Sequence, residues 1–262
     1  MRKSDIIERL NSAYFSSEPV EADVMALLAK LMQGAHTFVA LGASFGQFSK
    51  LACETLTNAT VVAVEADPLR VDVLRDNAAK WSGRNGNRLE VVQAAVASHR
   101  GTMSFQITNS CVSGGLFRHA LDHLDNATRD SVNWTEVTVP TVTLDEMFPK
   151  DPPDFVKMDI EGAELLALRG ATEILRKHRT IWFIELHHFS YTDERKTSEL
   201  VIELMRFHGL REVYIDQGVR CLFLKNPWRQ LPRLALWTVF VKAGIAARKA
   251  SRFLLGKRRN DK

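Results

Sequence analysis

Short blocks of apolar and β-branched residues alternate along the chain with longer amphipathic stretches. This order is typical of a parallel sheet with helices on both faces. The blocks that predict strands are residues 37–42, 60–66, 88–96, 154–160 and 180–188. The stretches that predict helices are residues 48–56, 68–81, 163–177 and 194–208. The pattern therefore predicts an α/β domain with a mostly parallel sheet.

Two parts of the chain depart from this alternation. After a helix that ends near Gly209, residues 211–215 and 219–224 predict a closing hairpin, which a simple dinucleotide-binding repeat lacks. Residues 101–153 contain two β-like runs, 103–107 and 135–144, around a polar middle. We expect this insertion to lie over the carboxyl ends of the strands, where ligands bind in open α/β sheets, and to form a lid or substrate wall.

Three segments are expected. Residues 1–36 form an N-terminal helical segment, residues 37–228 form the main domain, and residues 229–262 form a basic amphipathic tail. The tail has ten Lys or Arg residues and one acid, so it carries +9, whereas the whole chain carries +4 and residues 1–228 carry −5. The body thus lacks the positive charge typical of a nucleic-acid groove. The tail suits peripheral contact with an anionic membrane. The alternative is a helix packed on the acidic body.

Composition places the domain in an ordinary globular class, with 45% hydrophobic and 25% charged residues. Three widely separated cysteines fit neither a disulfide framework nor a metal spacing. No secretory signal pattern and no apolar run long enough to span a membrane is evident. A cytoplasmic location, with the tail as a means of membrane association, is the expectation.

A glycine turn follows the first predicted strand, in the run LGASFGQFS. Gly42, Ser44 and Gly46 would let a ligand approach the backbone, and the amides of the turn would face that ligand at a helix N-terminus. Glu65 ends the next strand, where a carboxylate can accept hydrogen bonds from two ribose hydroxyls. Its alternative role, capping the helix that begins at Pro68, suits Asp67 better.

The run KMDIEGAE, residues 157–164, puts four charges where buried sheet and a first helical turn are expected. Buried charges are costly unless they are paired or used. Complementation of a helix dipole explains Glu161 and Glu164 without any function. Asp159 precedes the turn at a strand tip, so it is a candidate for chemistry.

Glu185 and His187 end the last strand of the parallel series, in IELHH. Their spacing of two predicts that both point to one face of the strand. A histidine among carboxylates suits general base catalysis. A divalent metal held by Asp159, Glu185 and His187 is conceivable but is not predicted. Packing of the histidine at a strand end is the bland alternative.

The order of these motifs resembles that of the FkbM-type methyltransferases, over roughly residues 37–188. The resemblance rests on LGASFGQFS, VVAVEADP with LRDNA, AAVAS with Gly101 and Phe105, TVTLDE, VKMDIEGAELLALRGA and WFIELH. It implies a Rossmann-like class I methyltransferase fold, in which a seven-stranded sheet has an antiparallel last strand. It also implies transfer of a methyl group from S-adenosylmethionine to an oxygen, often of a sugar or polyketide hydroxyl.

The resemblance further implies the cofactor site. Gly42, Ser44 and Gly46 would form its turn, Glu65 would bind the ribose, and Ala66 would be a further cofactor-binding residue. The adenine wall would be Gln93, Ala94 and Ala95.

Asp159 would lie by the methionine moiety and the acceptor. Asp159 or His187 would be the base, with Glu161 and Glu185 as further catalytic candidates. The family turn usually carries an acid where this chain has Ala40 and an asparagine where it has Ser44. Asp159 or backbone carbonyls would then hold the methionine amino group.

The function predicted is therefore O-methylation of a small molecule or glycan, with lipid-linked acceptors included. One alternative is a non-catalytic protein of the same fold that serves as a membrane-surface or partner-binding module, which Ala40 favours. Another is a nicotinamide-dependent oxidoreductase, against which the closing hairpin and the missing third glycine of GxGxxG count.

Overall fold

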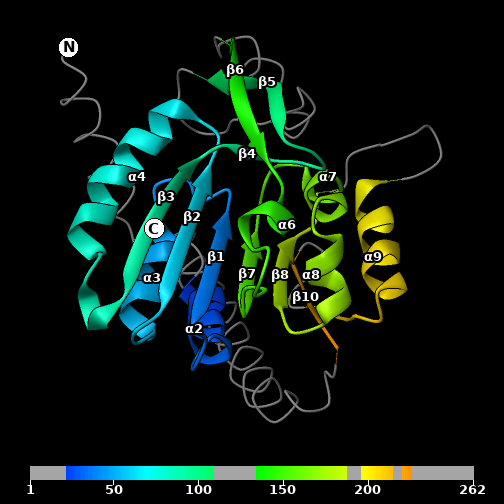
Figure 1. Ribbon diagram of the computed structural model, residues 1–262, viewed down its shortest axis with the longest axis horizontal. Coiled ribbons are helices and arrows are strands. Elements are labelled where there is room, and N and C mark those ends of the chain that lie inside the picture. Colours follow the sequence, from blue (N-terminus) through cyan, green and yellow to red (C-terminus); the bar gives the residue numbers. More distant parts are fainter. Residues whose placement is uncertain (1–21, 109–133, 188–195, 215–219, 226–262) are drawn as a thin grey trace, which may run out of the picture.

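A seven-stranded sheet forms the centre of the computed structural model, which describes residues 22–108, 134–187, 196–214 and 220–225 (Figure 1). Its strand order is β3-β2-β1-β7-β8-β10-β9. The strands are β1 (Thr37–Leu41), β2 (Thr60–Glu65), β3 (Arg88–Gln93), β7 (Phe155–Met158), β8 (Ile181–Glu185), β9 (Arg211–Tyr214) and β10 (Arg220–Leu224). The first five are parallel, and β10 runs antiparallel to both of its neighbours. The predicted class I methyltransferase topology is confirmed.

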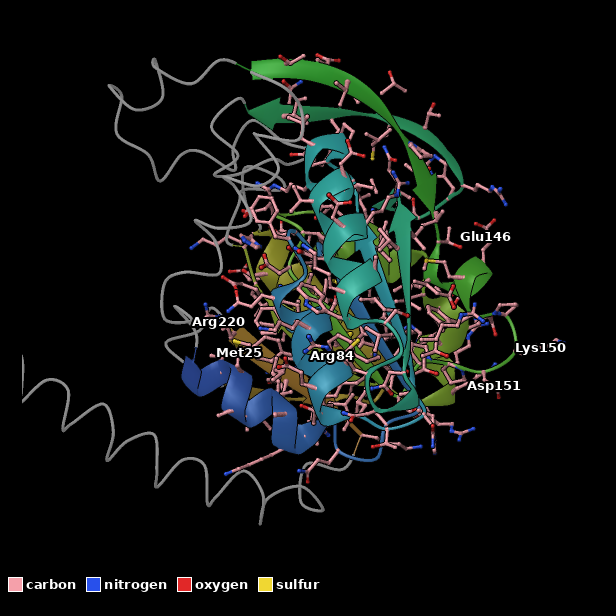
Figure 2. The ribbon with its side chains drawn as sticks, turned by 90° about the vertical axis from the view of Figure 1, so that its left-hand side faces the viewer. Met25, Arg84, Glu146, Lys150, Asp151 and Arg220 are labelled. Atoms are coloured by element: carbon pink, nitrogen blue, oxygen red, sulfur yellow. The ribbon has the colours of Figure 1, made fainter. Side chains whose placement is uncertain are left out.

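Helices cover both faces of this sheet. The first face carries α2 (Ala22–Leu31), α3 (Gln47–Thr55) and α4 (Pro68–Trp81). The second carries α6 (Leu144–Met147), α7 (Glu164–Arg169), α8 (Thr172–Lys177) and α9 (Thr197–Phe207). Figure 2 shows Met25 of α2 and Glu146 of α6 on opposite sides of the sheet. Among the described helices, none combines the length and apolar character needed to cross a membrane.

The strand pattern divides the core into two halves. In β1, Phe38 and Ala40 pack toward α2, α3 and α4, whereas Val39 and Leu41 pack toward the second face. All four are essentially inaccessible to solvent. Because successive side chains of a strand point to opposite faces, an uninterrupted apolar block is what a strand buried on both faces requires. Burial of each large side chain contributes about 1.5–3 kcal/mol.

The helix predicted over residues 163–177 is two helices, α7 and α8. The break comes at Gly170, which packs closely against the main chain of Ala97. A Cβ on Gly170 would lie 2.2 Å from the main-chain oxygen of Ala97. Asp145 lies outside α8 and stabilises its first turn, because its carboxylate accepts hydrogen bonds from the amides of Glu173 at 3.0 Å and Ile174 at 3.1 Å. The single-helix prediction was wrong because both contacts are tertiary.

The two β runs of the insertion belong to a smaller, three-stranded sheet. It has the order β4-β6-β5, with β4 (Ala95–Val96), β5 (Gly101–Thr108) and β6 (Trp134–Val142). β5 and β6 are antiparallel, which confirms the two predicted β runs, and they lie beyond the carboxyl ends of the parallel strands (Figure 1). The predicted strand 88–96 is split, because its last two residues pair with β6. The polar middle, 109–133, lies outside the described residues, so a lid or substrate wall stays a prediction.

The predicted division into three segments also stays a prediction. Within residues 1–36 the structure describes α2, which is helical as expected and packs on the sheet. The basic tail, 229–262, lies outside the described residues.

Candidate active site

The amides of the glycine turn between β1 and α3 bind mainly to acceptors on β2. Gly42 and Ala43 both donate to the carbonyl of Val64, at 3.0 and 2.9 Å, and Gly46 donates to Ala43 at 2.9 Å. Ser44 donates to Oε2 of Glu65 at 2.7 Å. These four amides therefore bind protein acceptors, which differs from the expectation that they face a ligand. Whether Gly42, Ser44 and Gly46 contact a cofactor stays a prediction.

Close packing explains the two glycines. A Cβ on Gly42, whose φ is +71°, would lie 1.8 Å from the main-chain oxygen of Asp159. A Cβ on Gly46, whose φ is +96°, would lie 2.7 Å from side-chain atoms of Leu74 and Trp81. The first contact brings the end of β1 against the end of β7. The turn is thus packed directly against the residue expected beside the methyl acceptor.

Ser44 adopts the left-handed conformation, with φ of +51°. Among residues with a side chain, asparagine and aspartate adopt this conformation most readily. The family resemblance leads us to expect asparagine at this position. The left-handed backbone gives a reason for that preference which does not depend on a ligand. Ala40, in place of the expected acid, is buried in the core on the first face of the sheet.

Glu65 lies at the carboxyl end of β2 with only 5% of its surface exposed. Its Oε1 accepts the amide of Asp67 at 2.9 Å, and its Oε2 accepts the amide of Ser44. Burial raises the pKa of this carboxyl, while nearby Arg70 and the two amides oppose the rise. Asp67, not Glu65, caps α4, through a bond from the amide of Leu69. The capping alternative for Glu65 is therefore wrong.

The predicted adenine wall lies next to Glu65. The amide of Ala94 donates to the main-chain oxygen of Glu65 at 3.0 Å. Ala66 and Ala95 belong to a small apolar cluster that also contains Phe105 of β5. Gln93 ends β3, and its side chain accepts a bond from Arg75 at 3.2 Å. The predicted cofactor residues of β2 and β3 are thus neighbours at one edge of the sheet.

Asp159 follows β7 and is paired with Lys157. Nζ of Lys157 lies 2.9 Å from Oδ2 of Asp159 and 4.6 Å from the centre of the Phe48 ring of α3. The lysine is buried, and the Asp159 side chain is 30% exposed. Burial of Asp159 raises its pKa, but the charge and hydrogen bond of Lys157, together with the charges of His187 and Arg220, outweigh burial and hold the pKa below its usual value. Asp159 is therefore an ionised carboxylate.

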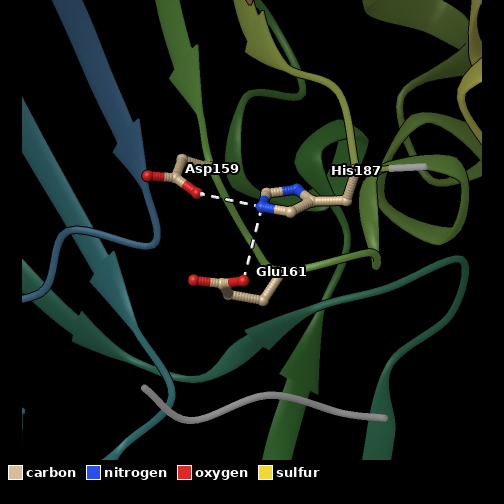
Figure 3. A group of neighbouring side chains, drawn as sticks. All are labelled: Asp159, Glu161 and His187. Carbon is tan, nitrogen blue, oxygen red and sulfur yellow. Dashed lines mark ion pairs between the residues drawn. The ribbon is translucent and has the colours of Figure 1, made fainter. Parts of the chain in front are cut away.

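His187 lies beside Asp159 and Glu161 (Figure 3), and it also contacts Glu164. Its Nε2 lies 3.3 Å from Oε2 of Glu161 and 3.9 Å from Oδ1 of Asp159. Its Nδ1 lies 2.8 Å from Oε1 of Glu164. Glu161 and Gly162 have φ of +52° and +97°, so the chain turns sharply between β7 and α7 and carries Glu161 toward the ring. We call Asp159, Glu161, Glu164 and His187 the acidic cluster.

The acidic cluster changes the protonation of its histidine. Burial lowers the pKa of His187, but the hydrogen bonds and charges of Glu161 and Glu164 outweigh it and raise the pKa to about 11. Without a bound cation the ring is therefore an imidazolium at neutral pH. An imidazolium has no lone pair with which to accept a proton. Of the two residues predicted as the catalytic base, Asp159 is therefore the better candidate, because it is ionised and can accept a proton. The assignment stays a prediction.

Glu185 is bound elsewhere. Its Oε2 accepts a bond from Nε of Arg220 at 3.1 Å, directly across from it on β10. Burial and the charge of Asp159 raise its pKa, and Arg220 opposes this. Within the described part of the chain, the group whose potential ligand atoms lie within 4.8 Å of one another is Asp159, Glu161 and His187. The metal set conceived from the sequence is thus corrected, with Glu161 in the place of Glu185.

A comparison with known protein families identifies the family of this chain. A family model described as the methyltransferase FkbM domain matches residues 41–212, well over half of the chain. The chain belongs to the FkbM methyltransferase family. Members of this family take their methyl group from S-adenosylmethionine, which is therefore the cofactor of this methyltransferase. A search of curated proteins found no match.

Solved structures with a similar fold include two methyltransferases. The chain is 19% identical to methyltransferase FkbM from Methylobacillus flagellatus KT, with a TM-score of 0.45, and the match covers 72% of this chain but 43% of that one. It is 14% identical to an O-methyltransferase from Bacillus cereus solved in complex with SAH, with a TM-score of 0.46 and coverage of 85% and 90%. The chain spans less than half the length of the Methylobacillus protein.

The residues of this FkbM methyltransferase fit the cofactor. An ionised carboxylate offers about four acceptor positions, and the described amides occupy two of those of Glu65. The remaining positions suit the two ribose hydroxyls that the family resemblance predicts for Glu65, and this role stays a prediction. Ala66, Ala94 and Ala95 beside it are small and apolar, as an adenine ring requires.

Proposed function

We propose that this FkbM methyltransferase methylates a hydroxyl oxygen of a small molecule or glycan. The observation that carries the proposal is the acidic cluster beside the glycine turn. Carboxylates 3.3 and 3.9 Å from the imidazole of His187 form a polar site suited to a hydroxyl, which must be oriented and must lose its proton. The turn that packs against Asp159 is part of the predicted cofactor site, so the acceptor and the cofactor would meet there.

The reaction needs little from the protein beyond placement and proton removal. When bound, S-adenosylmethionine supplies a methyl group on a sulfonium, which is already a strong electrophile. A bond forms between the acceptor oxygen and the methyl carbon, the sulfur–methyl bond breaks, and the hydroxyl proton leaves. Lys157 fixes Oδ2 of Asp159, so Oδ1 faces the site and can accept that proton. Glu161 would orient the acceptor through a second hydrogen bond.

A transfer assay tests this proposal. The purified protein is incubated with methyl-labelled S-adenosylmethionine and matched acceptors that carry a hydroxyl, an amine or a carboxyl at the same position. We expect label on the hydroxyl compound, in a product that resists mild alkali as an ether does. Label confined to the amine, or an alkali-labile methyl ester of the carboxyl compound, would contradict methylation of a hydroxyl. Binding of S-adenosylhomocysteine without transfer to any acceptor would favour the non-catalytic alternative.

We propose, separately, a location in the cytoplasm with the basic tail on anionic membrane, which would bring a lipid-linked acceptor close. The net charge of +9 on residues 229–262 supports it. Sedimentation of the full-length protein with phosphatidylglycerol vesicles, but not with phosphatidylcholine vesicles, is the expected result. Equal recovery with both would favour a tail that packs on the body.

A further inference from the structure

Three potential metal ligands converge in the acidic cluster. Nε2 of His187, Oε2 of Glu161 and Oδ1 of Asp159 point toward one another, with separations of 3.3 and 3.9 Å from the nitrogen to the two oxygens (Figure 3). Ligands that share one cation at about 2.0–2.2 Å lie about 3 Å apart. Small side-chain movements would therefore place all three on a common centre.

Two of the atoms that are not directed inward are already held, one on Asp159 and one on His187. Oδ2 of Asp159 accepts the bond from Lys157, so its other oxygen is left for the cluster. Nδ1 of His187 is held by Glu164, which leaves Nε2 directed at the two carboxylates. This carboxylate–histidine arrangement is the one that fixes the ring of a metal-bound histidine.

Glu164 is an independent observation in favour of a site. It is only 1% exposed, and its Oε1 also accepts the amide of Gly162 at 3.1 Å. Its Oε2 is buried and has no hydrogen-bond partner within the described chain. A buried acid with an unsatisfied oxygen is costly, and a function for the histidine that it orients would account for its presence.

The charges leave room for a divalent cation. The acidic cluster contains three carboxylates, those of Asp159, Glu161 and Glu164, and Lys157 is the cation beside them in the described residues. Glu185 is paired with Arg220, so these two charges cancel. With a neutral imidazole, two negative charges remain, which is the charge that a divalent ion neutralises.

We propose that Asp159, Glu161 and His187 bind one divalent cation of the Mn²⁺ or Mg²⁺ type, with Glu164 as the residue that positions His187. Two carboxylates and one imidazole favour Mn²⁺, which accepts oxygen and nitrogen ligands together. Three protein ligands leave coordination positions open for water or an acceptor oxygen. A hydroxyl bound there would lose its proton more easily, and this role, unlike the binding itself, rests on the proposed O-methyl transfer.

Titration of Mn²⁺ into the metal-free, full-length protein tests the inference, with free Mn²⁺ followed by electron paramagnetic resonance. We expect one ion to bind per chain. Glu161→Gln removes a ligand, and Glu164→Gln removes the partner of His187, so each should weaken binding at least about tenfold. Glu185→Gln is the matched control, because it removes the same charge from an acid that Arg220 already holds. It should weaken binding less than about threefold.

Two outcomes would overturn the inference. One is the absence of Mn²⁺ binding up to millimolar concentration, and the other is equal binding by the native protein and Glu161→Gln. In either case the imidazolium would be the ion that balances these carboxylates. Circular dichroism of each variant confirms that it is folded. Binding of S-adenosylhomocysteine to the same samples separates the two proposals, since it tests the cofactor site without the metal.

Discussion

Nδ1 of His187 lies 2.8 Å from Oε1 of Glu164, a carboxyl group that is almost completely buried. The two residues come from different elements, since Glu164 begins α7 and His187 follows β8. Their bond ties the carboxyl end of β8 to the first turn of α7. It also directs the other ring nitrogen at Asp159 and Glu161, so it sets the geometry of the acidic cluster.

This arrangement predicts a pH-dependent contribution to stability in the metal-free protein. The pKa of His187 is about 11 when folded and 6.5 as the reference value. Between these values the folded state holds a proton that the unfolded state has lost. The contribution is complete below pH 6.5 and is lost as pH rises toward 11, by up to about 1.4 kcal/mol per pH unit.

Urea unfolding at pH 7 and pH 9 with a chelator measures this effect, and His187→Gln is the comparison. The free energy of unfolding of the native protein should fall with pH by more than that of the variant. Parallel pH dependences in the two proteins would contradict the protonated ring.

A second prediction concerns Gly42 and its contact with Asp159. Gly42→Ala and Gly34→Ala both place a Cβ at positive φ, at a cost of about 1–2 kcal/mol. A Cβ at residue 34 meets nothing within 4 Å, whereas one at residue 42 meets the Asp159 oxygen at 1.8 Å. Gly42→Ala should therefore be destabilised by a further 1–3 kcal/mol or so in urea unfolding. Equal losses would show that this clash is relieved without cost.

The cap of α8 gives a third prediction. Asp145→Ala removes the acceptor for the amides of Glu173 and Ile174, and it should cost about 0.5–2 kcal/mol of stability. The neighbouring Glu146 is exposed, so Glu146→Ala controls for the change in charge. Thermal unfolding of both variants makes the comparison. An equal change in the two would mean that the cap contributes nothing measurable.

Cys53 should be unreactive in the folded protein. Burial raises the pKa of its thiol to about 11, with Arg84 opposing the rise. A raised pKa favours the neutral thiol, so at pH 8 about one molecule in a thousand carries the reactive thiolate. Iodoacetamide followed by peptide mass spectrometry should find Cys53 unmodified in buffer and modified in guanidinium. Rapid modification in buffer would contradict this burial.

The elements that the sequence predicted well are those with local causes. The helix bounds at Pro68 and Trp81 were predicted because Asp67 and Pro68 form an N-terminal cap and first turn that involve neighbouring residues only. The parallel strands β1, β2 and β8 were recognisable because each has apolar residues on both faces. Gly170 shows the opposite case, since its packing against Ala97 breaks a helix whose own pattern is continuous.

The candidate site shows the same division. Asp159 and His187 stood out in the sequence at strand ends, Glu161 was a further catalytic candidate, and the structure brings the three together. Glu164 was interpreted as a helix-dipole acid because a sequence does not show that its carboxyl is buried against His187. Glu185 was grouped with His187 by strand alternation, but it binds Arg220 of β10, a strand that is distant in sequence and pairs with β8 in the sheet.

Calorimetric titration of S-adenosylmethionine and S-adenosylhomocysteine into the native protein, Glu65→Ala and Glu54→Ala tests the cofactor site most directly. Glu54 lies in the last turn of α3, away from the carboxyl ends of the parallel strands, and pairs with Arg84. Glu54→Ala therefore controls for the loss of an acidic residue. We predict that both compounds bind the native protein and Glu54→Ala equally. Glu65→Ala should lose about 1–3 kcal/mol of binding free energy, because a charged acceptor is removed. Unchanged binding by Glu65→Ala, or no binding by the native protein, would contradict a cofactor site at the end of β2.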